Sequence, residues 1–257
     1  MTENDNSVFF GKKIFFLYPP ALLQNQVVAE LAQEEFEVYI AKDETKLRQA
    51  LKKFPDSIVF ACINERLKES AWDEWIRSII SIPETAAVNI GIIAGSADEN
   101  LMRKYLGQYK VTCGYTVIRS DMPGVTKQLV DILNNINAKG RRKYIRAFTD
   151  KEANTTVNFP INGTFINGLI KDISSVGFSC AFAEDPDLTK NSLFADIQLR
   201  LQSQLVKAEG IVFGSRMETN EKIYVILFTQ RIDPEVRTKI RKYIQFNLQS
   251  KMDIEIK

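Results

Sequence analysis

Short apolar runs alternate with helix-like segments along the first half of the chain. The helix-like segments repeat their apolar residues every three or four positions, and the apolar runs are short and continuous. The predicted strands are residues 14–18, 38–40, 57–63, 88–94 and 117–118, and the predicted helices are residues 23–32, 47–51, 72–80, 101–106 and 125–136. Strands that alternate with helices in this way predict a doubly wound parallel sheet covered on both faces.

The pattern changes to strands and turns after Gly140. Residues 197–202 alternate apolar and polar side chains, which is typical of a strand with one face in water. Residues 206–213 and 222–229 read as further strands around a polar turn at 218–221, and Asn162-Gly163 and Asn167-Gly168 are strong turn dipeptides. This half of the chain therefore predicts a small antiparallel β-barrel.

The chain ends in a predicted helix that Asp233 can cap and that Pro234 can open. Its apolar residues lie along one face: Val236, Ile240, Tyr243 and Leu248. The fold class is thus α/β plus β, with an α/β domain at residues 1–138 and a barrel with a C-terminal helix at residues 139–257. The 257 residues suffice for two such domains.

Composition excludes several kinds of chemistry. The chain has no histidine, which removes Ser-His-Asp catalysis and the common His-based zinc sites. Cys62, Cys113 and Cys180 are far apart in the sequence, so we expect buried thiols in a reducing compartment rather than a disulfide or a metal site. The net charge of +2 gives no overall bias towards nucleic acid or membrane.

The N-terminal residues are polar and acidic before any apolar residue, and no apolar run is long enough to cross a bilayer. We therefore expect no secretory signal, no membrane insertion and a cytoplasmic location.

A basic cluster lies at the boundary between the two predicted domains. Residues 139–146 read KGRRKYIR, and within them Arg142 and Arg146 form an RxxxR pair. Taken alone, such a cluster favours a solvated charge run, and a non-specific nucleic-acid contact is a second interpretation. Downstream, Asp172, Ser174 and Gly177 form a DxSxxG pattern in the first predicted hairpin region of the barrel. Taken alone, Asp172 and Ser174 would be read as turn caps.

The two motifs together, in this order and before a barrel and a helix, resemble the PilZ family of cyclic di-GMP receptors. The resemblance covers roughly residues 140 to 250 and extends to residues 224–228 and 233–235, which are similar to the family's last strand and C-terminal helix. The family often has a glycine in that strand, where this chain has Val225 and Ile226.

The resemblance implies a non-enzymatic receptor whose ligand is cyclic di-GMP, with no cofactor and no metal. The implied ligand-binding residues are Arg141, Arg142, Arg146, Asp172, Ser174 and Gly177. An arginine fork suits phosphate oxygens or a guanine edge, and Asp172 can accept from guanine N–H groups. Gly177 either permits close approach or supplies a positive φ in the turn. In the family, an arginine at the position of Arg141 is associated with an intercalated ligand dimer.

The first domain is similar to response-regulator receivers in architecture only. Receivers need carboxylates after the first strand and an aspartate at the end of the third, but here these strands are followed by Tyr18 and Asn64. The expected lysine is replaced around Arg119, and Asp98 and Asp121 read as helix caps. This pseudo-receiver, with Trp72 and Trp75 in its core, resembles the divergent N-terminal domains of spirochaete PilZ proteins.

We therefore predict that ligand fixes a mobile hinge at residues 139–147, reorients the domains and changes contacts with a motility or envelope partner. The N-terminal domain would serve contact with a protein partner or dimerisation. The alternatives are a ligand-independent interaction scaffold, an atypical response regulator, and a nucleic-acid binder.

Overall fold

The computed structural model describes residues 11–118, 120–149, 154–161 and 163–256 of the chain. These residues form two compact units. Residues up to 143 belong to the first unit together with residues from 249 onward, and residues 144–248 form the second. The first unit therefore includes the last turns of the C-terminal helix.

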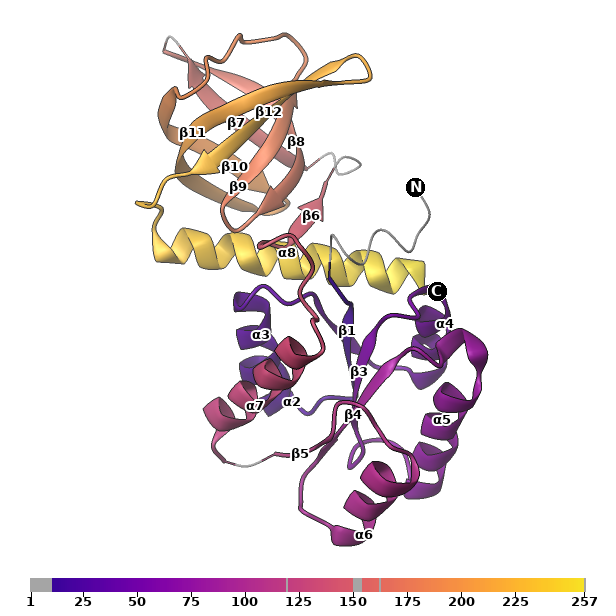
Figure 1. Ribbon diagram of the computed structural model, residues 1–257. Coiled ribbons are helices and arrows are strands. Elements are labelled where there is room, and N and C mark those ends of the chain that lie inside the picture. The colour runs from indigo at the N-terminus through magenta and orange to yellow at the C-terminus, as the bar shows by residue number, and fades with distance from the viewer. Residues whose placement is uncertain (1–10, 119, 150–153, 162, 257) are drawn as a thin grey trace. The chain divides into compact units, whose positions relative to one another are not determined.

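The first unit is built on a five-stranded parallel sheet, as the alternating pattern predicts. Its strands are β1 (Ile14–Leu17), β2 (Val38–Ala41), β3 (Ile58–Cys62), β4 (Asn89–Ala94) and β5 (Tyr115–Val117). They lie in the order β2-β1-β3-β4-β5, which is the order of flavodoxin-like and receiver folds. The strands are short and mostly apolar because helices cover both faces of the sheet (Figure 1). The polar exceptions are Asn89 of β4 and Thr116 of β5.

The covering helices correspond to the predicted ones, although two of them contain π-helical turns. They are α2 (Ala21–Leu23), η2 (Gln24–Val28), α3 (Ala29–Gln33), α4 (Glu44–Lys53), α5 (Glu69–Ser81), the short 3₁₀ turn η3 (Pro83–Thr85), α6 (Glu99–Met102), η4 (Arg103–Gln108) and α7 (Met122–Asn135). Helices α2, α3 and α7 lie on one side of the sheet, and α4, α5 and α6 lie on the other (Figure 1). Trp72 and Trp75 are buried in the core, as predicted.

The second unit is a closed antiparallel barrel. Its strands are β6 (Arg146–Phe148), β7 (Thr155–Ile161), β8 (Thr164–Ser174), β9 (Gly177–Phe182), β10 (Leu193–Leu201), β11 (Gln204–Glu218) and β12 (Glu221–Phe228). Six of them close in the order β8-β7-β10-β11-β12-β9, because β8 also pairs with β9. Strand β6 pairs with the second half of β8, beyond the residues that pair with β7. The antiparallel barrel predicted from the sequence is therefore confirmed.

The turn predictions have mixed outcomes. Gly163 has a φ of +78°, which fits the predicted turn, and Asn162 lies outside the described residues. The prediction of a turn at Asn167-Gly168 is wrong, because both residues lie within β8. Here the glycine serves close packing, since a Cβ on Gly168 would lie 2.8 Å from the Phe182 ring and from the carbonyl oxygen of Ala181.

The barrel is closed at one end by the C-terminal helix α8 (Pro234–Glu255). As predicted, the Asp233 carboxylate accepts a hydrogen bond from the backbone N–H of Glu235, at 2.7 Å, and so caps the helix. Ile240 and Tyr243 are buried in the barrel core, with Val236 and Leu248 packed against it. From Gln249 onward the same helix belongs to the first unit.

The three cysteines are buried free thiols, in agreement with the sequence. Burial raises the pKa of Cys113 to about 11 and raises the pKa of Cys62 and of Cys180 further. Within the described part of the chain, no helix is both long and apolar enough to span a bilayer.

Candidate functional site

The DxSxxG pattern lies on the hairpin formed by β8 and β9, and the end of the RxxxR pair lies beside it. In the strand register, Arg146 of β6 is opposite Ser174 of β8, and Ser174 is opposite Gly177 of β9. Asp172 is opposite Phe148 on one side and Ser179 on the other. The neighbours of Arg146 and Ser179 along their strands, Ala147 and Phe178, are buried in the barrel core. Because side chains alternate along a strand, the site residues therefore lie on the outer face.

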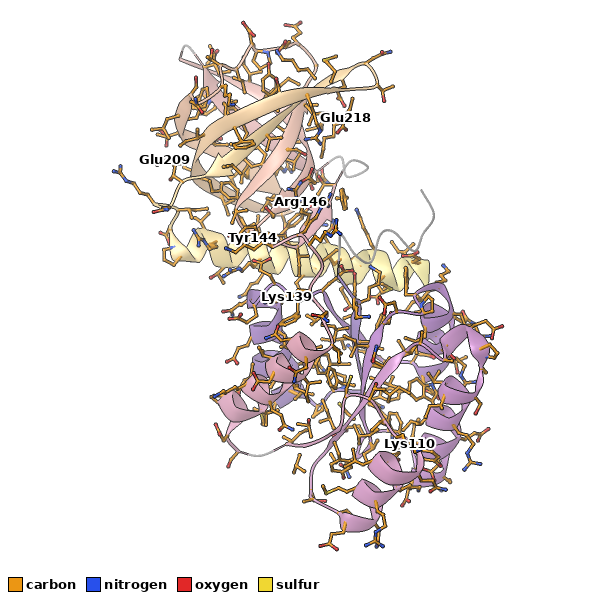
Figure 2. All side chains as sticks on the ribbon, in the orientation of Figure 1. Lys110, Lys139, Tyr144, Arg146, Glu209 and Glu218 are labelled. Carbon is orange, nitrogen blue, oxygen red and sulfur yellow. The ribbon has the colours of Figure 1, made fainter. Side chains whose placement is uncertain are left out.

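Arg146 and Asp172 form an ion pair. The Nη1 atom of Arg146 donates to Oδ1 of Asp172 at 3.0 Å. The Asp172 side chain is 10% exposed and the Arg146 side chain is 40% exposed, so a buried carboxylate anchors a guanidinium that reaches solvent. Arg146 is labelled in Figure 2. An arginine fork has five N–H donors, and this arrangement leaves part of it available to a ligand.

The second carboxylate oxygen of Asp172 accepts a hydrogen bond from the hydroxyl of Ser179. Ser179 is not among the site residues predicted from the sequence. The strand register of the β8–β9 hairpin predicts that Ser179 lies beside Asp172. Once Ser174 is opposite Gly177 across a two-residue turn, Asp172 must be opposite Ser179. Ser179 and Arg146 together hold the carboxylate of Asp172 in one orientation.

Ser174 is buried and bonds within its own turn. Its hydroxyl donates to the carbonyl oxygen of Gly177 at 3.0 Å and accepts from the backbone N–H of Val176 at 3.4 Å. The turn-cap interpretation of this residue therefore describes its contacts in this structure. It does not describe Asp172, whose hydrogen bonds go to the side chains of Arg146 and Ser179.

Gly177 is required by close packing against a neighbouring strand. A Cβ at this position would lie 2.2 Å from the carbonyl oxygen of Ile226 in β12. Its φ is not in the positive region, so the suggestion that it supplies a positive φ in the turn is wrong. Gly177 is itself buried, and it is opposite Leu227 on β12.

The same register row continues onto apolar side chains. Leu227 is opposite Ile211 of β11, and Ile211 is opposite Leu193 of β10. These three side chains are all exposed, from 37% for Ile211 to 58% for Leu193. The polar end of the row at Arg146 is thus continuous with an apolar surface across three strands.

Arg141 and Arg142 are exposed and precede β6. They belong to the first unit, whereas Arg146, Asp172, Ser174 and Gly177 belong to the second. The structure therefore brings together four of the six predicted site residues and does not place the other two relative to them. Arg146 and Ala147, at the end of the predicted hinge, are part of β6.

The carboxyl end of the parallel sheet has the residues that the sequence indicated. Asp98 accepts from the backbone N–H groups of Asn100 and Leu101, and Asp121 accepts from that of Gly124, so both acids cap helices as predicted. The predicted replacement at Arg119 lies outside the described residues.

Two further polar residues follow β1 and β3 at this end of the sheet. Asn64 accepts from the backbone N–H of Gly95 at 2.7 Å, and Tyr18 donates to the Glu44 carboxylate. Among the residues that the structure describes, no group of three cysteine, aspartate or glutamate side chains is arranged to hold a metal ion.

Comparison with known proteins gives matches for both halves of the chain. The PilZ domain family model matches residues 140–246. The search of curated proteins gave no match.

Among solved structures, the PilZ domain of YcgR from Escherichia coli with c-di-GMP is similar at 15% identity and a TM-score of 0.38, covering 45% of this chain and 96% of that one. PlzA from Borreliella burgdorferi, in complex with c-di-GMP, is similar at 19% identity and a TM-score of 0.30, covering 40% of this chain. The chain spans about half of the PlzA structure, at 51%.

The Mn²⁺-bound response regulator Rcp1 is similar at 16% identity and a TM-score of 0.38, covering 48% of this chain and 92% of that one. The strand order of the first unit independently gives it the receiver-like fold.

For the second unit, the match to the PilZ family model covers the linker, the closed barrel and most of helix α8. Residues 140–246 of this chain are therefore a PilZ domain.

Proposed function

We propose that the PilZ domain of this chain binds cyclic di-GMP and that the protein acts as a receptor for this second messenger. One observation carries the proposal: the partly exposed guanidinium of Arg146 is anchored on the buried carboxylate of Asp172, and its register row continues to the exposed side chains of Leu227 and Ile211. This arrangement offers donors to an anionic ligand, and the guanidinium plane can stack on a base.

The chemistry of the ligand matches these groups. Cyclic di-GMP presents two phosphates and two guanines, and an arginine fork can bond either a phosphate or the O6 and N7 edge of guanine. Asp172 has further lone pairs on its two carboxylate oxygens and can accept from guanine N1–H and N2–H₂. The row of exposed aliphatic side chains beyond Gly177 extends the apolar part of this surface.

Arg141 and Arg142 complete the site in this proposal. Three residues separate Arg142 from β6, and this short stretch of chain gives both arginines enough reach to meet a ligand held at Arg146. Ligand then fixes the segment between residue 139 and β6 and reorients the two units. The free energy for this change is the difference between the ligand's affinity for the reoriented state, in which Arg141 and Arg142 contact it, and its affinity for the state without these contacts.

The protein acts by binding rather than by catalysis, and it needs no cofactor. The first unit contacts a protein partner in a motility or envelope function, and we propose neither nucleic acid nor membrane as a target. The location that fits this role is the cytoplasm.

Calorimetric titration with cyclic di-GMP tests the site. We expect Arg146→Ala, Asp172→Ala and Arg142→Ala each to weaken binding by about tenfold to a hundredfold, because a hydrogen bond to a charged group contributes about 1.5–3 kcal/mol. Arg200→Ala is the matched control, since Arg200 is an exposed arginine at the other end of β10 from Leu193. Equal affinity in the wild type and the Arg146 variant would show that the assigned site is wrong.

Two further measurements separate specificity from the domain movement. Cyclic di-AMP should bind far more weakly, because adenine lacks the O6 acceptor and the N1–H donor of guanine. Small-angle scattering should change when cyclic di-GMP saturates the protein. An unchanged scattering curve would reject the reorientation and leave ligand binding intact.

A further inference from the structure

Strand β2 forms one edge of the parallel sheet in the first unit. Its four residues, Val38-Tyr39-Ile40-Ala41, include no charged residue and no proline, which are two of the usual means of protecting an edge strand. Strand β2 pairs with β1 along its whole length, and no strand in the described part of the chain pairs with its other side. An uncharged edge of this kind is a template for pairing with another strand unless something covers it.

Gln249 of α8 covers this edge at Ile40. The side-chain Oε1 accepts from the backbone N–H of Ile40 at 2.9 Å, and Nε2 donates to the backbone carbonyl of Ile40 at 3.1 Å. Both bonds can form only with the amide in this orientation. Two residues that exchange both bonds are the hydrogen-bonded pair of an antiparallel ladder. The carboxamide of Gln249 therefore occupies the place that an antiparallel strand would take.

The surrounding residues hold Gln249 in this position. The remaining amide hydrogen of its Nε2 is directed to Asp253, one turn later, at 2.8 Å. Met252 is 3% exposed, and Lys53 donates to the carbonyl oxygen of Glu255 at 2.8 Å. The cover thus consists of a short helical segment attached by a few polar contacts and one buried side chain.

We propose that this segment, residues 249–255, is a releasable cover, and that the uncovered β2 edge binds β2 of a second copy of this chain. Three observations favour this occupant. The Gln249 contact has antiparallel geometry, the edge is apolar and uncharged, and an antiparallel pair of identical strands centred on Ile40 satisfies both edges at once. The resulting dimer has a closed two-fold interface.

Gln249→Glu tests the cover without changing the size of the side chain. The substitution replaces the N–H donor by a second oxygen, which faces both the Ile40 carbonyl and the Asp253 carboxylate. We expect hydrogen exchange at the Ile40 amide to accelerate by about tenfold or more. Sedimentation should show a new concentration-dependent dimer. Gln33→Glu, on the exposed face of α3, makes the same charge change and should alter neither measurement.

Cysteine cross-linking tests the register of the dimer. Paired Ile40 residues would have Cα atoms about 5.5 Å apart, which is within the range of a disulfide. Ile40→Cys in the Gln249→Glu background should therefore form a cross-linked dimer on oxidation. Lys42→Cys is the control, because it would face residue 38 of the other copy, with its counterpart about 14 Å away. The native cysteines are buried and should not interfere.

Two results would overturn the proposal. If the Ile40 amide exchanges at the wild-type rate in Gln249→Glu, the segment is not a cover. If the amide exchanges faster but the protein stays monomeric, or if Lys42→Cys cross-links as well as Ile40→Cys, a second β2 strand is not the occupant.

Discussion

The carboxyl end of the parallel sheet and the outer row of the barrel both gather polar side chains, but the two regions use them differently. At the sheet, Asp98 and Asp121 cap helices and Asn64 bonds the backbone of Gly95. In the barrel, the buried Asp172 holds Arg146, whose side chain remains partly exposed. Polar groups that satisfy the fold itself indicate a structural role, whereas the binding site proposed above rests on an exposed donor held by a buried anchor.

The largest effect that this comparison predicts is at Gly177. An added Cβ would meet the carbonyl oxygen of Ile226 at 2.2 Å, a backbone atom that cannot move without distorting β12. We expect Gly177→Ala to destabilise the barrel by about 3 kcal/mol and to lower its Tm by more than about 10 °C, measured by calorimetry. Gly214→Ala is the control, since no atom lies within 4 Å of its added Cβ. Similar losses in both variants would contradict the close-packing explanation.

A smaller loss of stability is expected at Asp98, and two substitutions show whether this residue only caps its helix or also needs its charge. Asp98→Ala removes the acceptor for two backbone N–H groups of α6 and should destabilise the first unit by about 1 kcal/mol. Asp98→Asn keeps an acceptor and should stay close to the wild type in urea unfolding. If Asn is as damaging as Ala, the charge of Asp98 has a function beyond capping.

Ionisation of Tyr18 should limit the stability of the first unit at high pH. Burial, together with the hydrogen bond to Glu44, raises the pKa of Tyr18 to about 12 from 10.0. The folded protein thus holds this proton more tightly than the unfolded chain. The protonated Tyr18 hydroxyl therefore makes its full contribution to the free energy of unfolding below pH 10, and this contribution is lost as the pH rises towards 12. Tyr18→Phe should remove this loss. Urea unfolding of the wild type and the variant at pH 9 and pH 11.5 would measure the difference.

The smallest expected effect is at the acid limit of the barrel. The Tyr224 hydroxyl, followed by Lys222, lowers the pKa of Asp185 to about 2 from 3.8. The contribution of the Asp185 carboxylate to the free energy of unfolding is therefore present above pH 3.8 and is lost as the pH falls towards 2. Because the Asp185 side chain is about half exposed, the effect is small. The stability difference between the wild type and Asp185→Asn should narrow between pH 5 and pH 2, and a constant difference would contradict this assignment.

Much of the fold followed from local patterns in the sequence. Four of the apolar runs mark strands of the sheet because burial on both faces favours apolar side chains, whereas β5 has Thr116 at its centre and shares only Val117 with the strand predicted at residues 117–118. The association of Arg146 with Asp172 rested on the family resemblance and not on periodicity, and only the register of β6, β8 and β9 shows how the two meet.

Other features depended on contacts that a local pattern does not contain. Asn167-Gly168 has turn chemistry, but the Phe182 ring requires a glycine there within a strand. Gln249 lies beyond the apolar stripe of the last helix, and its partner Ile40 is far away in the sequence. Contacts of this kind become visible only once the chain is folded.

Strand β6 has a consequence for how the barrel could respond to its surroundings. The ring of six strands closes through β8 and β9, so every rung of that ring is complete without β6. In the described part of the sheet, β6 is joined to β8 alone, by three register pairs. The strand can therefore fray locally, but fraying takes Ala147 out of the barrel core and leaves Asp172 and Ser174 paired with β9 alone.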